Sequence, residues 1–351
     1  MKKLIHVALV VFAVLLFSCK GKQQAQATVD NTDSGTVAKL IEEVNTGYEN
    51  NGDDVFPDFE LKTTSPQPID PAKFREYLIA ESVGYSSIQQ RLINDLLKLD
   101  NTSAKALVDS KEVLKKYFKN ATAKQCDSLY LPYYSYAILL LSNTANDEYY
   151  GQVPSDFFNT YDSFEKLPPA YQPIMKELNG YGIQLEDIGE GCADLSFYPD
   201  YFYELFKPYT TEATRRYLEL LAYERANEFL FDAAVTITWE ELAGRIVSFE
   251  EFLNKHSQSM FAGEIKDMYN SYTGLLLTGC DNTPTCDWHM DGTRKLNTDA
   301  YEAYQRIIET YNHRRIAKIL KEYCSIFEKS DMVWNEELDE FIAENDFSSR
   351  Y

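Results

Sequence analysis

The feature that most constrains the fold is an apolar pattern that recurs after 55 residues near the end of the chain. Within each copy the spacing follows the 3.6-residue period of an amphipathic helix, and a short polar turn divides the copy into two helices. The pattern predicts two helix–turn–helix units with a small alanine at a helix contact in each. The first copy has Phe249, Phe252, Leu253, Phe261, Ala262, Ile265, Met268 and Tyr272, and the second has Tyr304, Ile307, Ile308, Ile316, Ala317, Leu320, Tyr323 and Phe327.

Helical periodicity also dominates the rest of the chain. Residues 86–100 and 103–118 each carry one apolar stripe, and the turn between them predicts two antiparallel helices. Thr238 and Glu241 form a capping box, and Pro71 follows Asp70 as it would at a first helical position. Only residues 234–238, AVTIT, are as rich in β-branched residues as a strand. We therefore expect an all-α fold.

Trp239, Leu242 and the small Ala243 resemble the opening of a tetratricopeptide repeat, and Ala262 resembles the small residue of its second helix. The spacing of 55 departs from the 34 residues of that family, and no proline closes either copy. The resemblance implies antiparallel helix pairs stacked as a divergent α-solenoid.

The first residues have the order of a secretory signal. Lys2 and Lys3 precede an apolar run from Leu4 to Phe17, which is shorter than the roughly 20 residues of a membrane span. The run ends in Leu16-Phe17-Ser18-Cys19, which resembles the lipobox of bacterial lipoproteins. The resemblance implies cleavage before Cys19 and acyl chains on that residue, which would hold the protein to a membrane. The alternative is a buried N-terminal helix.

Residues 20–36 contain one large apolar residue, Val29, and cannot form a core. We therefore divide the chain into a signal peptide (1–18), a lipidated cysteine with a tether (19–36), an N-terminal helical region (37–235) and a C-terminal helical-repeat region (236–351). Lys20 stands where lipoprotein sorting would place an aspartate for the inner membrane, which favours the outer membrane. No acidic cluster follows Cys19, which favours the periplasmic leaflet over the cell surface.

The charge of the chain excludes nucleic acid as a partner. The chain has 34 basic and 55 acidic side chains, and loss of Lys2 and Lys3 with the signal changes its formal charge from −21 to −23. Nucleic-acid binding needs clustered Lys and Arg, and no basic stripe is present. The expected membrane contact is therefore made by the acyl chains on Cys19.

Five cysteines remain besides Cys19. Cys280 and Cys286 bracket a short loop that could close as a disulfide, or all five could be small buried apolar residues. His289 would extend the pair toward a metal site, but the set lacks a fourth ligand, and we expect no metal or other cofactor.

Tyrosine is abundant, at 26 residues, and it clusters in two segments. Such rings suit stacking on a glycan or peptide, and they suit packing between helices equally well. The candidate ligand platform consists of Tyr133, Tyr134, Tyr136, Tyr201 and Tyr203. The glycine-rich segment 180–194 carries several carboxylates, and we expect a solvated acidic loop there rather than a calcium site.

No sequence signature of catalysis is present, and we nominate no catalytic residue. The mature chain has His256, His289 and His313, and it lacks the nucleophile and zinc motifs. These observations favour a module that binds protein, peptide or glycan. The alternative is a carbohydrate-active α/α toroid with a carboxylate pair, which the length and the acidic residues allow.

Overall fold

A computed structural model of the chain describes residues 71–148, 168–189 and 192–347, which belong to a compact unit from Pro66 to Tyr351. Cys19 and the segments expected to be a signal peptide and a tether lie outside the described residues. Among the described helices, none is both long and apolar enough to span a membrane.

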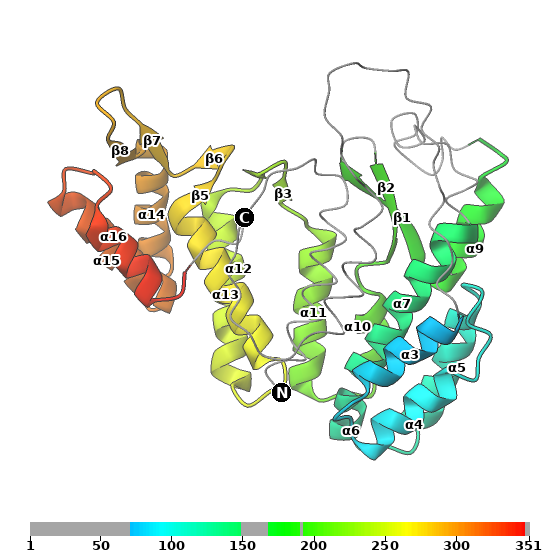
Figure 1. Ribbon diagram of the computed structural model, residues 1–351. Helices are drawn as coiled ribbons and strands as arrows, with labels where there is room; N and C mark the ends of the chain where they lie inside the picture. The colour runs from blue at the N-terminus through cyan, green and yellow to red at the C-terminus, as the bar shows by residue number, and fades with distance from the viewer. Residues whose placement is uncertain (1–70, 149–167, 190–191, 348–351) are drawn as a thin grey trace, which may run out of the picture. The chain divides into compact units, whose positions relative to one another are not determined.

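The described chain is mostly helical, and its helices pack in pairs (Figure 1). The N-terminal part contains α3 (Pro71–Glu81), α4 (Ser87–Leu96), α5 (Ala106–Phe118), α6 (Ala123–Ser128), α7 (Tyr130–Glu148) and α9 (Gln172–Tyr181). Helix α4 packs against α5, which confirms the pair expected over residues 86–118. Helices α3, α4 and α5 all contact α7, whose Tyr133, Tyr136 and Leu140 are fully buried.

The period of 55 residues corresponds to two helix pairs. After α10 (Tyr201–Phe206) and α11 (Glu212–Ala226), the first pair is α12 (Trp239–His256) with α13 (Ala262–Thr278). The second pair is α14 (Thr298–Thr310) with α15 (Arg315–Lys329), and α16 (Glu336–Glu344) packs against α15. All sixteen matched positions are buried or half-buried, which confirms the two helix pairs. Helix α12 also contacts α14 and α15, so the pairs lie against each other.

The helix starts follow the expected capping. Thr238 accepts a hydrogen bond from the amide of Glu241 at 3.2 Å, and Glu241 accepts from the amide of Thr238 at 3.0 Å. The capping box therefore starts α12, and AVTIT is not a strand as a whole, because only Ala234–Val235 forms β4.

The expected all-α fold fits the mostly helical structure, although four antiparallel hairpins also connect helices in the described part of the chain. They are β1 (Ile183–Gly189) with β2 (Cys192–Phe197), β3 (Leu230–Phe231) with β4 (Ala234–Val235), β5 (Gly279–Cys280) with β6 (Thr283–Pro284), and β7 (Cys286–Trp288) with β8 (Arg294–Leu296). The segment expected to be an acidic loop is the first of these hairpins. Most of these strands span two or three residues, which is too short for an alternating pattern to show.

Three hydroxyl groups cover the C-terminal end of α13. Tyr304 donates to the carbonyl of Leu276 at 2.6 Å, while Tyr323 and Thr285 donate to the carbonyl of Leu277, each at 2.8 Å. The last carbonyls of a helix have no partner within it, so these bonds satisfy groups that would otherwise be buried without one. Gly279 then turns the chain with φ +66°, where a Cβ would lie 2.2 Å from the carbonyl oxygen of Thr283.

Candidate functional site

The two tyrosine-rich segments form the start of α7 and helix α10, and the fold packs them together. Tyr133 and Tyr136 are fully buried, and Tyr201 is 7 % exposed. The Tyr133 hydroxyl lies 3.3 Å from that of Tyr201 and 3.1 Å from that of Ser110. These three rings therefore belong to the core, and the platform expected from them is wrong, because no ligand can stack on them from solvent.

The other two platform residues are half-buried at the edge of this aromatic core. The ring of Tyr134 packs against that of Phe202, with centroids 5.0 Å apart, and its hydroxyl accepts a hydrogen bond from Arg225 at 3.3 Å. Tyr203 holds the ammonium of Lys207 over its ring at 5.0 Å. Tyr134 and Tyr203 are therefore partly accessible to solvent, unlike the buried Tyr133, Tyr136 and Tyr201.

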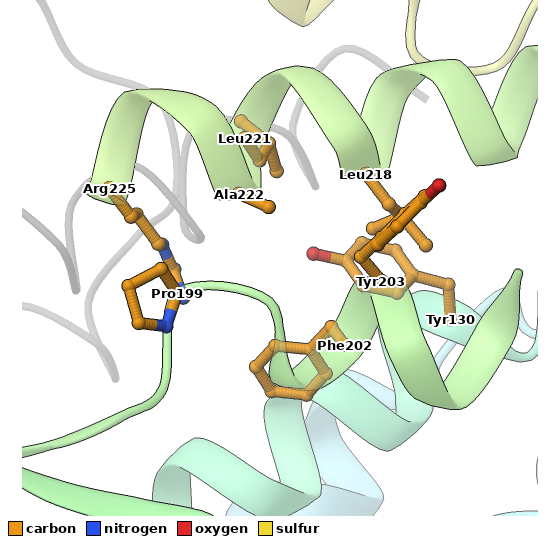
Figure 2. Close-up of a pocket in the computed structure, with 8 residues that line it drawn as sticks. All are labelled: Tyr130, Pro199, Phe202, Tyr203, Leu218, Leu221, Ala222 and Arg225. Carbon is orange, nitrogen blue, oxygen red and sulfur yellow. The ribbon is translucent and has the colours of Figure 1, made fainter. Parts of the chain in front are cut away.

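A shallow crevice lies beside these two residues and opens on solvent; its cavity volume is about 10 Å³, roughly the space that one water molecule occupies. One wall comes from α11 and the other from α10, with Pro199 before α10 and Tyr130 from α7 (Figure 2). Figure 2 places Arg225 beside Pro199 at one end of the crevice. Most of the lining is aliphatic or aromatic, and Arg225 is its charged residue: the lining residues are Tyr130, Pro199, Phe202, Tyr203, Leu218, Leu221, Ala222 and Arg225.

Carboxyl groups surround Arg225 on the side of the protein core. Burial raises the pKa of Glu264, while the hydrogen bond from Tyr217 and the charge of Arg225 oppose this rise. Burial also raises the pKa of Glu228, and Glu186, whose side chain is hydrogen-bonded to it, raises that pKa further.

A second cationic side chain lies deeper, between α11 and α12. Arg245 donates to Glu224 at 2.7 Å, and their side chains are only 7 % and 9 % exposed. Tyr272 also donates to Glu224, at 2.8 Å, and the Arg245 guanidinium lies 4.6 Å from the centroid of Phe229. Both side chains are buried, so we assign the pair to the folding of the C-terminal region.

The described side chains offer no catalytic arrangement of the kinds considered. His256 packs against Phe252, whereas His289 and His313 are exposed. In the described part of the chain, no group of three or more His, Cys, Asp or Glu side chains could hold a metal ion.

Of the two alternatives for Cys280 and Cys286, a disulfide or buried apolar residues, the structure has the second, because both are buried free thiols. Cys280 pairs with Thr283 in the β5–β6 hairpin, whereas Cys286 begins β7 and pairs with Leu296. The two cysteines therefore belong to different hairpins. Cys126 and Cys324 are also buried free thiols.

Sequence reasoning missed Arg225, Glu264 and the crevice itself. A single arginine within a helix carries no spacing signal, and its partner Tyr134 lies 91 residues away in the chain. Comparison of the chain with protein-family models, with curated proteins and with solved structures found no match.

Proposed function

We propose that this chain is a membrane-anchored, helical-repeat lipoprotein that acts as a binding module for a peptide segment of a partner. The observation that carries the proposal is the crevice between α10 and α11, where an apolar lining ends in the guanidinium of Arg225. Apolar pockets with a few placed polar groups are the usual form of a recognition site.

The lining favours a peptide over a glycan. Sugars stack on exposed flat rings, and the rings of Tyr133, Tyr136 and Tyr201 are buried. The crevice instead presents Leu218, Leu221 and Ala222, which suit one apolar side chain. Arg225, which donates to Tyr134, places a positive charge at the end of the crevice, where a ligand carbonyl oxygen would be attracted to it.

The helix packing supports a divergent α-solenoid. Helices α10 and α11 pack together, α11 packs against α12, and α12 packs against the α14–α15 pair. Successive pairs that contact their neighbours are what a stacked array requires. In this proposal the crevice lies between the two helices of one pair, and the repeat region supports α11 from behind.

The anchor part of the proposal comes from the sequence. Acyl chains on Cys19, each contributing about 0.8 kcal/mol per buried methylene, would hold a protein that carries no other strong membrane signal. The negative charge of the chain favours a partner whose peptide is basic near the apolar residue.

The test is a selection of the full chain against a library of end-blocked random octapeptides, followed by titration of the selected peptides by calorimetry. Leu221→Trp should fill the crevice and abolish binding, whereas Glu219→Trp, on an exposed position of the same helix, should leave binding unchanged. Ala222→Leu provides a second, milder filling variant, and thermal melts establish that each variant is folded.

The proposal makes a specific demand on the selected peptides. The selected peptides should share an apolar residue at one position. Arg225→Met, which removes the guanidinium, should weaken the binding of all of them. Binding that survives both crevice-filling variants, or a library that yields no consensus, would overturn the peptide-binding proposal.

A further inference from the structure

The tip of the β7–β8 hairpin carries two large apolar side chains in solvent. Trp288 is 76 % exposed and Met290 is fully exposed. Single exposed apolar residues are common on proteins, but here two lie within three positions on one protruding loop (Figure 1). The fold therefore keeps both side chains in water without packing either against the helices.

The hairpin holds this tip in a fixed conformation. Asp291 accepts hydrogen bonds from the amide and the hydroxyl of Thr293, at 3.0 and 2.6 Å, and Gly292 turns the chain with φ +80°. The amide of His289 bonds the carbonyl of Thr293 at 2.9 Å and closes the turn. A tip that is already ordered loses little conformational entropy when its side chains are buried by a partner.

The base of the hairpin is fixed to the helical body. Cys286 and Leu296, which face each other across the strands, are both buried. The next pair on that face is Trp288 with Arg294, and the Arg294 guanidinium lies 4.1 Å from the centroid of Trp334. Arg294 is thus retained by the body, and Trp288 is left exposed.

The hairpin is also locally neutral in a strongly acidic chain. Asp287 lies opposite Lys295, and Asp291 and Arg294 add one charge of each sign. A lipid surface would repel most of this chain, but it would not repel the hairpin.

We propose that Trp288 and Met290 insert into the headgroup region of the membrane to which Cys19 anchors the chain. The inference rests on the anchor part of the proposed function. Tryptophan prefers the boundary between water and lipid, where its ring is buried and its N–H remains hydrated. Once the acyl chains hold the protein at the surface, even a weak second contact is populated, because its effective concentration is high.

A protein partner would need more surface than this tip offers. Specific interfaces bury about 800 Å² on each side, whereas a tryptophan buries at most about 250 Å². The aspartates at positions 287 and 291 limit the depth of insertion, so the contact stays in the headgroup region. The hairpin then orients the helical body relative to the membrane.

The experiment uses the full acylated protein reconstituted into phosphatidylcholine vesicles, with or without bromine on the lipid acyl chains near the headgroup. Brominated lipid should quench part of the tryptophan emission of the native protein. In Trp288→Phe this quenching should be lost, while Met290→Ser should reduce it by shortening the time spent inserted. Trp239 and Trp334, which are half-buried, provide the remaining emission in Trp288→Phe, whereas Met290→Ser keeps all three tryptophans.

Flotation separates failure of the hairpin contact from failure of the anchor. Protein that floats with the vesicles but is quenched equally in native and Trp288→Phe forms, or not at all, overturns the hairpin contact and leaves the anchor in place. Protein that does not float overturns the anchor, and with it the hairpin contact. A third outcome is that brominated lipid does not quench Trp288, but its emission shifts when an envelope protein fraction is added. This outcome would assign the tip to a protein partner and also overturn the proposal.

Discussion

Tyr217 donates a hydrogen bond of 2.8 Å to the carboxylate of Glu264, and its ring stacks on Phe261 with centroids 3.9 Å apart and planes 4° from parallel. Tyr217 lies on α11, whereas Phe261 and Glu264 lie at the start of α13. One side chain thus joins the N-terminal helical region to the repeat region by a stack and a hydrogen bond.

The environment of Glu264 should make stability depend on pH. Its pKa is raised in the folded state, chiefly by burial. Folding favours the protonated form of Glu264. The stabilisation from this carboxyl group is therefore complete below its unfolded pKa of about 4.5, and it is lost as pH rises through its folded pKa. Glu264→Gln keeps an acceptor for Tyr217. Its free energy of unfolding should therefore rise relative to that of the native protein as pH rises from about 4.5 through the folded pKa of Glu264.

Urea melts from pH 4 to pH 8 measure this difference, with exposed Glu309→Gln as the control for loss of one charge. A Glu264→Gln difference that stays constant with pH would show that the carboxyl does not change its protonation on folding.

Breaking the buried ion pair should be costly. Arg245→Met leaves the Glu224 carboxylate buried without its cationic partner, although Tyr272 still donates to it, so we expect a loss of about 3–5 kcal/mol in the free energy of unfolding at neutral pH. The loss should shrink at acidic pH, because Glu224 can then protonate. The double variant Arg245→Met/Glu224→Leu should recover part of the loss, and a double variant worse than Arg245→Met would contradict an electrostatic origin.

Replacing the small alanine of each repeat by leucine should lower stability by different amounts. Ala317 is fully buried within α15, so Ala317→Leu should destabilise by roughly 1–3 kcal/mol through overpacking. Ala262 is half-buried at the first position of α13, and Ala262→Leu should cost less. Lys266→Leu and Lys321→Leu, both at exposed positions, are the controls, and equal urea midpoints for the alanine and lysine series would contradict the repeat.

The cysteines should behave as buried thiols. Burial raises the pKa of Cys280 and Cys286, and it raises the pKa of Cys324 to about 12. The thiolate is the reactive form, so iodoacetamide at pH 8 should label these residues slowly in the folded protein and completely in denaturant without reductant. Mass spectrometry that recovers a Cys280–Cys286 linked peptide would show instead that the bridge forms.

The anchor is tested by one substitution. Cys19→Ala should abolish labelling by a radioactive fatty acid and release the protein from the membrane fraction, because only this residue can carry the acyl chains. Native protein that carries no acyl label would exclude lipidation.

The sequence predicted the helices well because their burial follows a 3.6-residue period over many turns. The pair over residues 86–118, the capping box at Thr238 and the two pairs of the repeat are confirmed. The hairpins were missed because they are short, and the one at residues 183–197 carries glycine and carboxylates that are typical of a loop. A signal for β1 existed, since Ile183 and Leu185 alternate with polar residues, but the turn residues around it obscured the pattern.

The candidate site was predicted less well. The tyrosine clusters pointed to the correct part of the fold, because α7 and α10 do meet there. Their exposure could not be predicted, since an aromatic ring on a helix is equally suited to a core and to a surface. Arg225 faces the crevice only because α11 packs against α10, and that packing depends on contacts far apart in the sequence.

The hydroxyl groups at the end of α13 give the array a direction. Tyr304 and Tyr323 stand where the preceding copy has Phe249 and Met268, neither of which can donate. The α14–α15 pair therefore carries two donors that are useful only when the end of another pair's second helix lies beside it. Moved to the front of the chain, away from the end of α13, this pair would bury two hydroxyls without these acceptors. The units are thus not interchangeable, and insertion of a further copy is expected to be tolerated after α16 only if that copy brings its own donors.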